Sequence, residues 1–293
     1  MEVGLQHHED PPRPRRSVIY VPASNERAVA SAGALRCDAV ILDLEDSVAA
    51  DAKPQARERA AAAVSEGRFP GREVIVRING SGTPWAEADL AAVVAAGADG
   101  VLMPKISSPQ DVELWDARLE ALGSPARLWA MIETSSGVLD VRAIAQAGRR
   151  TRLAALVVGT NDLILEMRLR PTPDRAPLQP FLAMVVASAR ESELIALDGV
   201  YNPLDDLTGF ETECRQGAAF GFDGKTLVHP SQIEACNRIF SPSRDDVTWA
   251  EAIVAAFASP EAQDKGAIRL QGRMVERLHL EAAERVLRLA RMN

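Results

Sequence analysis

Short apolar runs alternate with longer amphipathic, Ala-rich segments along most of this chain. Eight such runs occur, at residues 17–23, 38–46, 73–80, 100–106, 127–134, 153–162, 195–202 and 224–230. The segments between them have the apolar spacing of helices, and several begin with a Ser, Thr or Asn suited to an N-cap. Pro54 and Pro84 are placed to occupy a first helical turn. The pattern therefore predicts eight strand-then-helix units.

Eight such units with near-continuous apolar strands indicate a parallel sheet that is buried on both faces. We predict an α/β fold, a (β/α)8 TIM barrel over residues 16–241, because a barrel of this kind takes about 200–250 residues. An open doubly wound sheet is the alternative. It is disfavoured because the first strand is not followed by a GxGxxG sequence.

The two ends of the chain differ from this repeating pattern. We expect residues 1–15, which include His7 and His8, to form a flexible N-terminal tail. Residues 242–293 form a C-terminal helical extension with helix patterns at 244–258 and 277–291 and a strand-like stretch at 267–275. This extension looks too short for a core of its own. We therefore expect it to pack, as a lid, on the barrel or on a neighbouring subunit.

Composition narrows the function classes. The 293 residues are 47% hydrophobic and 25% charged, with a net charge of −8, and no concentrated basic face suggests nucleic-acid binding. Apolar runs stay below the roughly 18–20 residues of a membrane span. Cys37, Cys214 and Cys236 lack the spacing of a zinc site or disulfide framework. With no signal or transit pattern at the start, we expect a cytoplasmic protein.

Polar residues gather where the predicted strands end, and barrel enzymes keep their chemistry at the carboxyl ends of their strands. The acidic members are Asp43, Glu45, Asp46, Glu133 and Asp162. Crowded carboxylates repel one another unless a cation or protons offset the charge. Oxygen ligands with open positions suit Mg²⁺, with Mn²⁺ possible, and Glu133 and Asp162 come from adjacent strands. The alternative is that each acid caps a helix or pairs with an Arg.

Two basic residues face these acids from other strand ends. Arg77 ends a buried strand, where its fork geometry would fit a substrate carboxylate. The alternative for Arg77 is an internal salt bridge to Glu45 or Asp43. Lys105 could form a Schiff base, as in metal-independent barrel aldolases, but charge balance is the favoured role.

With these residues in hand, the chain resembles the citrate lyase beta-subunit-like family. This family comprises CoA-ester lyases such as malyl-CoA and citramalyl-CoA lyases, within the metal-dependent 2-keto-acid aldolases. The matching segments cover about residues 16–241. They are "YVPASN", "AVILDLEDSV", "VRING", "VLMPK", "MIET", "VVGTNDL", "DGVYN" and "GFDGKTLVHPSQI".

The resemblance implies roles for individual residues. It implies that Glu133 and Asp162 hold Mg²⁺, that Arg77 grips the keto-acid carboxylate, and that Glu133 also borders the substrate. In related lyases an acid of a C-terminal segment enters the site from a neighbouring subunit of a trimer, and here that position is Glu276, where Asp is commoner. The candidate catalytic residues are Arg77, Glu276 and Glu45, the last of these from the group of acids at the strand ends. The CoA-binding candidates are Tyr20, Pro22 and His229.

The activity that the resemblance implies is Mg²⁺-dependent retro-Claisen cleavage of a carboxylated 3-hydroxyacyl-CoA to an acyl-CoA and a 2-keto acid. Three alternatives stay open: a malyl-CoA-type thioesterase or synthase variant, a Schiff-base aldolase using Lys105, and a citrate lyase beta subunit acting on acyl-carrier thioesters. We expect a homotrimer or a dimer of trimers, with no nucleic-acid or membrane partner.

Overall fold

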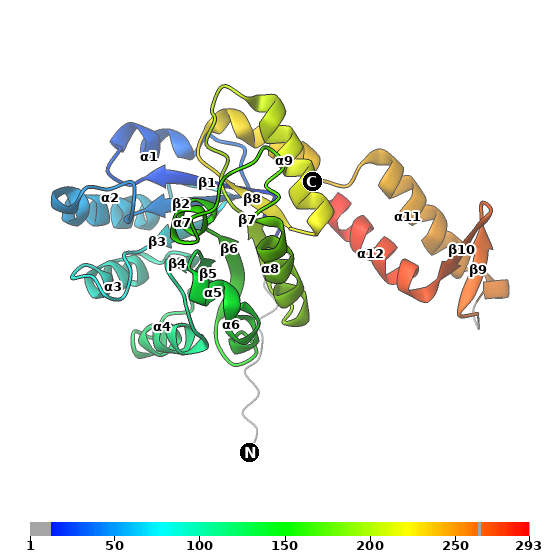
Figure 1. The fold of residues 1–293 in the computed structure, drawn as a ribbon, viewed down its shortest axis with the longest axis horizontal. Helices are drawn as coiled ribbons and strands as arrows, with labels where there is room; N and C mark the ends of the chain where they lie inside the picture. Colours follow the sequence, from blue (N-terminus) through cyan, green and yellow to red (C-terminus); the bar gives the residue numbers. More distant parts are fainter. Residues whose placement is uncertain (1–12, 263–264, 293) are drawn as a thin grey trace, which may run out of the picture.

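The computed structural model describes residues 13–262 and 265–292. Eight parallel strands pair in sequence order, and β1 pairs with β8 to close the barrel (Figure 1). This arrangement confirms the predicted TIM barrel. The strands are β1 Ser17–Pro22, β2 Ala39–Asp43, β3 Glu73–Arg77, β4 Gly100–Met103, β5 Arg127–Ile132, β6 Leu153–Val158, β7 Ile195–Asp198 and β8 Gly224–Leu227.

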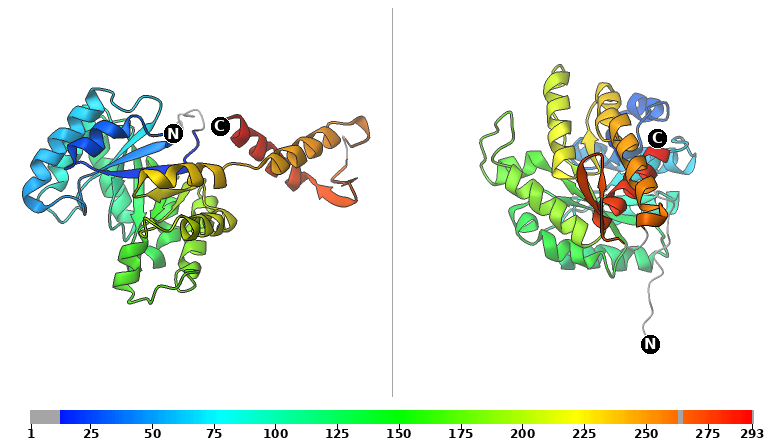
Figure 2. Two further views of the ribbon diagram at one scale, coloured as in Figure 1. Left: turned by 90° about the horizontal axis from the view of Figure 1, so that it is seen from above. Right: turned by 90° about the vertical axis from the view of Figure 1, so that its right-hand side faces the viewer.

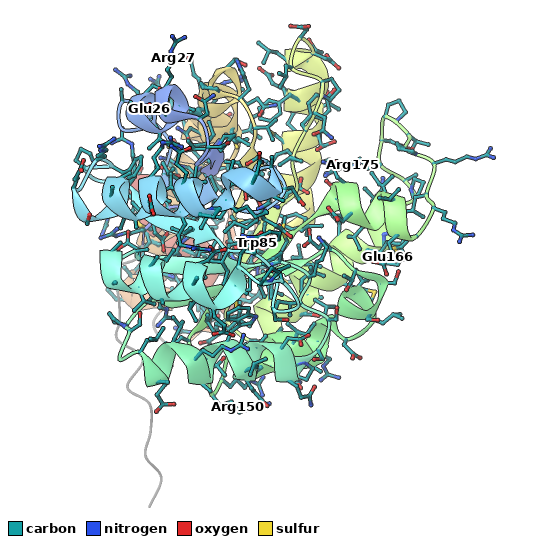
Figure 3. All side chains as sticks on the ribbon, turned by 90° about the vertical axis from the view of Figure 1, so that its left-hand side faces the viewer. Glu26, Arg27, Trp85, Arg150, Glu166 and Arg175 are labelled. Carbon is teal, nitrogen blue, oxygen red and sulfur yellow. The ribbon has the colours of Figure 1, made fainter. Side chains whose placement is uncertain are left out.

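Helices surround the strands, and several of them start with the predicted capping chemistry. The Asn25 and Ser108 side chains accept hydrogen bonds from backbone amides of the helices that follow them. Pro54 lies in the first turn of α2, as predicted. Pro84 does not lie in a helix: the chain turns there, and Trp85, labelled in Figure 3, precedes α3. The helices of the barrel are α1 Glu26–Ala32, α2 Lys53–Ser65, α3 Ala86–Ala96, α4 Pro109–Ala121, α5 Ser135–Leu139, α6 Val141–Ala147, α7 Thr160–Glu166, α8 Gln179–Glu191, α9 Leu207–Phe220 and α10 Ile233–Ile239, with short 3-10 turns at Ala50–Ala52 and Pro230–Gln232.

The barrel strands bury both of their faces. Because successive side chains of a strand point in opposite directions, one set fills the barrel and the other packs against the helices. Ile75, Leu102 and Trp129 belong to the inner cluster, whereas Val76, Val101 and Leu128 belong to the larger cluster shared with the helices. This double burial explains why the strands read as continuous apolar runs. The inner cluster fills the interior of the barrel.

Arg15 packs against the amino-terminal side of the barrel. Its guanidinium pairs with Glu73 at the start of β3 and lies 5.6 Å from the Trp129 ring centroid. The predicted flexible tail of residues 1–15 is therefore wrong for Arg15, because a buried acid and an aromatic face hold it. Residues 1–12, with His7 and His8, lie outside the described residues.

The C-terminal extension is a small unit beside the barrel. It consists of α11 Arg244–Phe257, a 3-10 turn Pro260–Ala262, an antiparallel hairpin of β9 Ala267–Leu270 and β10 Arg273–Glu276, and α12 Arg277–Arg291. Ile253, Phe257 and Val275 are buried in a cluster formed within the extension. The expectation that the extension lacks a core of its own is thus wrong, because α12 lays its apolar face on α11.

Figures 1 and 2 show this extension projecting away from the barrel. It does not cover the barrel of its own chain as a lid. Packing on a neighbouring subunit stays a prediction. Within the described part of the chain, no helix combines the length and the apolar character needed to cross a membrane.

Candidate active site

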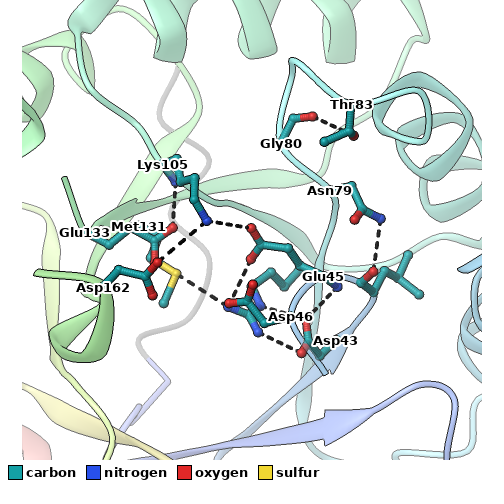
Figure 4. Close-up of polar contacts among 12 residues, drawn as sticks. Asp43, Glu45, Asp46, Asn79, Gly80, Thr83, Lys105, Met131, Glu133 and Asp162 are labelled. Carbon is teal, nitrogen blue, oxygen red and sulfur yellow. Dashed lines mark hydrogen bonds and ion pairs between the residues drawn. The ribbon is translucent and has the colours of Figure 1, made fainter. Parts of the chain in front are cut away.

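A pocket of about 330 Å³ opens at the carboxyl ends of the strands. Residues from seven of the eight strand ends line it, with both acidic and apolar walls. Figure 4 shows the polar contacts on its acidic side. The lining residues are Tyr20, Pro22, Asp43, Asp46, Ser47, Arg77, Met131, Val158, Gly159, Thr160, Asn161, Asp162, Val200, Thr226 and Val228.

Arg77 is the buried cation of this pocket. Its Nε and Nη2 atoms donate to the two Asp43 carboxylate oxygens at 2.7 Å each, and its Nη1 lies 3.2 Å from Asp46 Oδ2. Glu45 Oε2 is 3.0 Å from the same Nη1, although without the alignment of a hydrogen bond. The internal salt bridge that sequence analysis left open therefore exists. It fixes the guanidinium through Asp43 while Nη1 borders the pocket.

The Arg77–Asp43 pair is charged on both sides. Burial lowers the pKa of Arg77, but Asp43 outweighs it and raises that pKa well above its ordinary value. Burial likewise raises the pKa of Asp43, and Arg77 with the Ser47 and Glu45 amides outweighs it and lowers that pKa. A bidentate pair of this kind is rigid. Arg77 is thus held in place before any ligand arrives.

Glu133 follows β5 and is 1% exposed. Its Oε1 accepts a hydrogen bond from the Lys105 amide at 2.8 Å, whereas its Oε2 has no hydrogen-bond partner among the described residues. Burial, reinforced by Glu45 and Asp162, raises the pKa of Glu133 to about 8. A buried carboxylate oxygen without a donor is costly, so this position calls for a proton or a cation.

Gly159 is what lets Glu133 occupy this position. A Cβ added at Gly159 would lie 2.5 Å from Glu133 Oε2, closer than real contacts allow. Gly159 follows β6 and precedes α7, whose first turn carries Asp162. The short β6–α7 junction therefore brings the backbone against Glu133 and places the Asp162 carboxylate on the same rim.

Lys105 lies between the acids. Its Nζ is 3.3 Å from Glu45 Oε1 and 3.7 Å from Asp162 Oδ1 (Figure 4). Burial lowers the pKa of Lys105, but Glu45, Glu133 and Asp162 outweigh it and raise that pKa. A Schiff base needs a neutral amine, and this environment favours the charged ammonium. The contacts thus support charge balance rather than the Schiff-base alternative.

The donor set fits a hard divalent cation. In the described ranges, no group of three or more His, Cys, Asp or Glu side chains is placed to hold a metal by itself. Mg²⁺ binds through one or two carboxylates and keeps waters or substrate oxygens as its other ligands. Glu133 and Asp162 offer two such carboxylates, and Glu133 Oε2 is unpartnered. The residues present therefore fit Mg²⁺.

The remaining predicted residues fall into two groups. Tyr20 and Pro22 line the pocket, and the buried Tyr20 hydroxyl has no hydrogen-bond partner in the described structure. His229 lies one residue beyond the pocket-lining Val228, and its ring accepts from the Ser231 amide. Glu276 lies in the extension, where it precedes α12, and the structure does not bring it to the pocket of its own chain.

Sequence analysis missed two residues that shape the site. Met131 Sδ lies 3.9 Å from Arg77 Nη1. The sequence could have predicted this position, because Met131 precedes Glu133 by two residues along the strand and therefore faces the same side. Lys53 is buried at the start of α2 and donates to the Leu44 and Glu45 carbonyls at 2.9 Å each. It thereby holds the loop that carries Glu45.

The sequence is similar to those of several known proteins. The model of the HpcH/HpaI aldolase/citrate lyase family matches residues 16–230. A (3S)-malyl-CoA thioesterase of Cereibacter sphaeroides is 42% identical over 274 residues, 94% of each chain. Citrate lyase subunit beta of Leuconostoc mesenteroides subsp. cremoris is 32% identical over 96% of this chain and 95% of its own.

One solved structure is similar over nearly its whole length. It is protein CitE from Mycobacterium tuberculosis in complex with magnesium, acetoacetate and coenzyme A. That chain is 30% identical, with a TM-score of 0.77, and the match covers 95% of the present chain and 98% of CitE. The similarity therefore includes the extension as well as the barrel.

Proposed function

The chain belongs to the HpcH/HpaI aldolase/citrate lyase family, and on that premise we propose that it is an Mg²⁺-dependent carbon–carbon lyase. Its substrate would be a carboxylated 3-hydroxyacyl-CoA of the malyl, citramalyl or citryl type, cleaved to an acyl-CoA and a 2-keto acid. One observation carries the proposal. The unpartnered oxygen of Glu133 lies against Gly159, and Gly159, Asp162 and the anchored Arg77 line the same pocket.

Glu133 and Asp162 are the residues that would hold the metal. Mg²⁺ supplies Lewis-acid stabilisation of negative charge on a substrate oxygen when it is bound, and Mn²⁺ could replace it. The magnesium in the CitE complex supports this assignment. Glu133 is also placed to border the substrate, since its carboxylate lies beside Gly159 in the pocket wall.

Arg77 would bind the substrate carboxylate. Asp43 already orients its guanidinium, so binding costs little further ordering. The Nη1 edge now faces Asp46, whose side chain is 55% exposed and can move aside. The thioester arm of CoA would then lie along Tyr20, Pro22 and His229. Tyr20 and Pro22 line the pocket, and His229 follows the pocket-lining Val228.

Cleavage breaks the bond between the hydroxyl-bearing carbon and the carbon next to the thioester. The hydroxyl loses its proton, a keto group forms, and the electron pair stays on the thioester side until a proton reaches that carbon. Glu45 is the candidate in the same chain for accepting the hydroxyl proton. Glu276 from a neighbouring subunit is the candidate for proton transfer at the acetyl carbon, which requires an oligomer such as a homotrimer.

A thioesterase is the second candidate function, because the relative at 42% identity carries the name (3S)-malyl-CoA thioesterase. Water would then attack the thioester carbonyl, and the products would be free CoA and a hydroxy acid. A third candidate is a beta subunit acting on acyl-carrier thioesters, supported by the citrate lyase beta relative. Activity of the isolated protein on CoA esters would speak against this third candidate.

A substrate screen tests these functions together. The purified chain would be given malyl-, citramalyl-, methylmalyl- and 3-hydroxy-3-methylglutaryl-CoA, each with Mg²⁺ and with a chelator. We expect an acyl-CoA and a 2-keto acid from at least one ester, only with the metal. Free CoA without a new acyl-CoA would support the thioesterase instead. Undiminished activity in the chelator would overturn the metal-dependent mechanism.

A further inference from the structure

Lysine is a rare residue in this chain. Of the 33 basic residues that are Lys or Arg, four are lysines, at positions 53, 105, 225 and 265. Lys53 and Lys225 are buried and donate to fixed oxygens. Lys105 instead has a side chain that is 51% exposed, although it faces three carboxylates. An ammonium is a compact point charge on a flexible stem, unlike the planar fork of Arg.

The backbone of Lys105 turns both of its donors toward the carboxylates. Its φ angle is +56°, in the left-handed region that residues other than glycine seldom adopt. In this conformation the amide donates to Glu133 Oε1 at 2.8 Å, while Nζ reaches Glu45 and Asp162. A backbone outlier at a rim of acids is a reason to look for a functional role.

The ammonium contacts are loose. Nζ lies 3.3 Å from Glu45 and 3.7 Å from Asp162, compared with 2.7 Å between Arg77 and Asp43. Glu133 Oε2 meanwhile has no partner. The ammonium therefore supplies positive charge to this group of acids without satisfying all of them, and its exposed stem lets it leave.

We propose that Lys105 is a displaceable counter-ion: its ammonium occupies the cation position beside Asp162 in the metal-free protein and moves away when the metal binds. This inference rests on the proposed metal site at Glu133 and Asp162. Lys105 keeps Glu45 as a partner after displacement, since Glu45 lies on the side away from Asp162. It is a positioning residue, and it lowers the affinity for Mg²⁺ while keeping the metal-free rim folded.

The first experiment measures the Mg²⁺ dissociation constant by isothermal titration calorimetry. We expect Lys105→Met to bind Mg²⁺ about tenfold more tightly than the unaltered protein, because a competing charge is gone. Lys105→Arg keeps the charge and should bind no more tightly than the unaltered protein. Lys265→Met removes a charge from the extension and serves as the matched control, with unchanged affinity.

The second experiment follows thermal unfolding in chelator and in saturating Mg²⁺. Lys105→Met should be less stable than the unaltered protein in chelator, and Mg²⁺ should raise its Tm by a larger amount. If this variant fails to fold, Lys105→Gln, which retains a polar end, takes its place. The proposal would be overturned if the neutral variant at Lys105 bound Mg²⁺ with the same affinity as the unaltered protein, or more weakly.

Failure of the metal site itself gives a different result. If the unaltered protein and Lys105→Met both bind no Mg²⁺, the proposed metal-dependent function fails, and the inference with it. If both bind with equal affinity and Glu133→Gln abolishes binding, the metal site stands and only the role of Lys105 is overturned.

Discussion

Two groups of charged side chains in this barrel differ in their balance of acids and bases. The first, which we call the outer cluster, consists of Arg175, Asp198, Glu213 and Lys225. Lys225 Nζ is 3.1 Å from Asp198 and 2.7 Å from Glu213, and Arg175 Nη1 is 2.9 Å from Asp198. Asp198 and Lys225 are on β7 and β8 and Glu213 is on α9, while Arg175 lies in the loop before α8 (Figure 3). Two acids meet two bases, so the cluster is neutral.

The second group, the rim cluster, consists of Asp43, Glu45, Asp46, Glu133 and Asp162 with Arg77 and Lys105. Five acids meet two bases. Carboxylates in excess are stable only with protons or a further cation. The outer cluster therefore has the balanced composition of a structural ion-pair network that links strands to a helix. The rim cluster has the excess of acids that is typical of a cation-binding site.

The largest expected effect is on activity, from Glu133→Gln. The substitution keeps the shape of the side chain and removes a proposed metal ligand, so kcat/KM should fall by at least about 10³-fold. The free energy of unfolding should stay the same or rise, because the substitution removes a buried carboxylate oxygen that has no hydrogen-bond partner. Steady-state kinetics and urea unfolding would measure the two effects. Glu113→Gln, at a surface pair with Arg150, is the control, and near-normal metal-dependent turnover in Glu133→Gln would show that the metal assignment is wrong.

Lys225→Met should lower the stability of the protein and leave its activity nearly unchanged, the reverse of Glu133→Gln. It leaves Asp198 and Glu213 buried with Arg175 alone, and breaking such a group by removing one partner costs about 3–5 kcal/mol. Urea unfolding should show this loss, whereas kcat of the folded fraction should change little, because Lys225 points outward from the barrel between β8 and α9. A loss of kcat that matches that of Glu133→Gln, with unchanged stability, would place Lys225 in the site instead.

Gly159→Ala tests the packing that positions Glu133. An added Cβ would meet Glu133 Oε2 at 2.5 Å and push the carboxylate away from Asp162. Misplacing a reacting group by about 1 Å can cost roughly 10²-fold in rate. We expect a fall of that order in kcat/KM and a weaker Mg²⁺ affinity. Gly82→Ala is the control, because a Cβ there meets nothing within 4 Å; an equal effect of both variants would contradict the packing argument.

The two clusters were not equally accessible to sequence reasoning. The rim residues follow apolar strands, and the barrel geometry brings all strand ends to one edge, so Arg77, Glu133 and Asp162 could be placed together in advance. Asp198 and Lys225 lie within apolar runs, and their partner Arg175 comes from a loop far away in sequence. No local pattern links them, so the outer cluster emerged only from the structure.

The ends of the chain and the turns were also poorly predicted. Pro84 satisfied a helix-start pattern but lies in a turn, and Arg15 belongs to the barrel through Glu73. The small core of the extension depends on how α12 lies on α11, which periodicity does not fix. The position of Glu276 relative to a neighbouring pocket depends on subunit contacts, which are not encoded in any one segment.

The smallest expected effect is a pH dependence that belongs to the rim cluster alone. In the metal-free protein the pKa of Glu133 is raised from its ordinary 4.5 to about 8, chiefly by burial. Between these values the folded state holds a proton that the unfolded state has released. The free energy of unfolding should therefore fall as the pH rises through this window, by about 1 kcal/mol per pH unit, and level off above pH 8.

Urea unfolding in chelator from pH 5.5 to 7.5 would measure that slope. Glu133→Gln should reduce it to the part due to Glu45, whose pKa is also raised, chiefly by burial, and Glu113→Gln should keep it in full. Saturating Mg²⁺ should flatten it in the unaltered protein, because the metal competes with the proton. The outer cluster should not contribute, since Lys225 and Arg175 overcome burial and lower the pKa of Asp198, while Asp198 and Glu213 raise that of Lys225. Equal slopes for the unaltered protein and Glu133→Gln would mean that Glu133 is already paired, and the contrast between the clusters would then disappear.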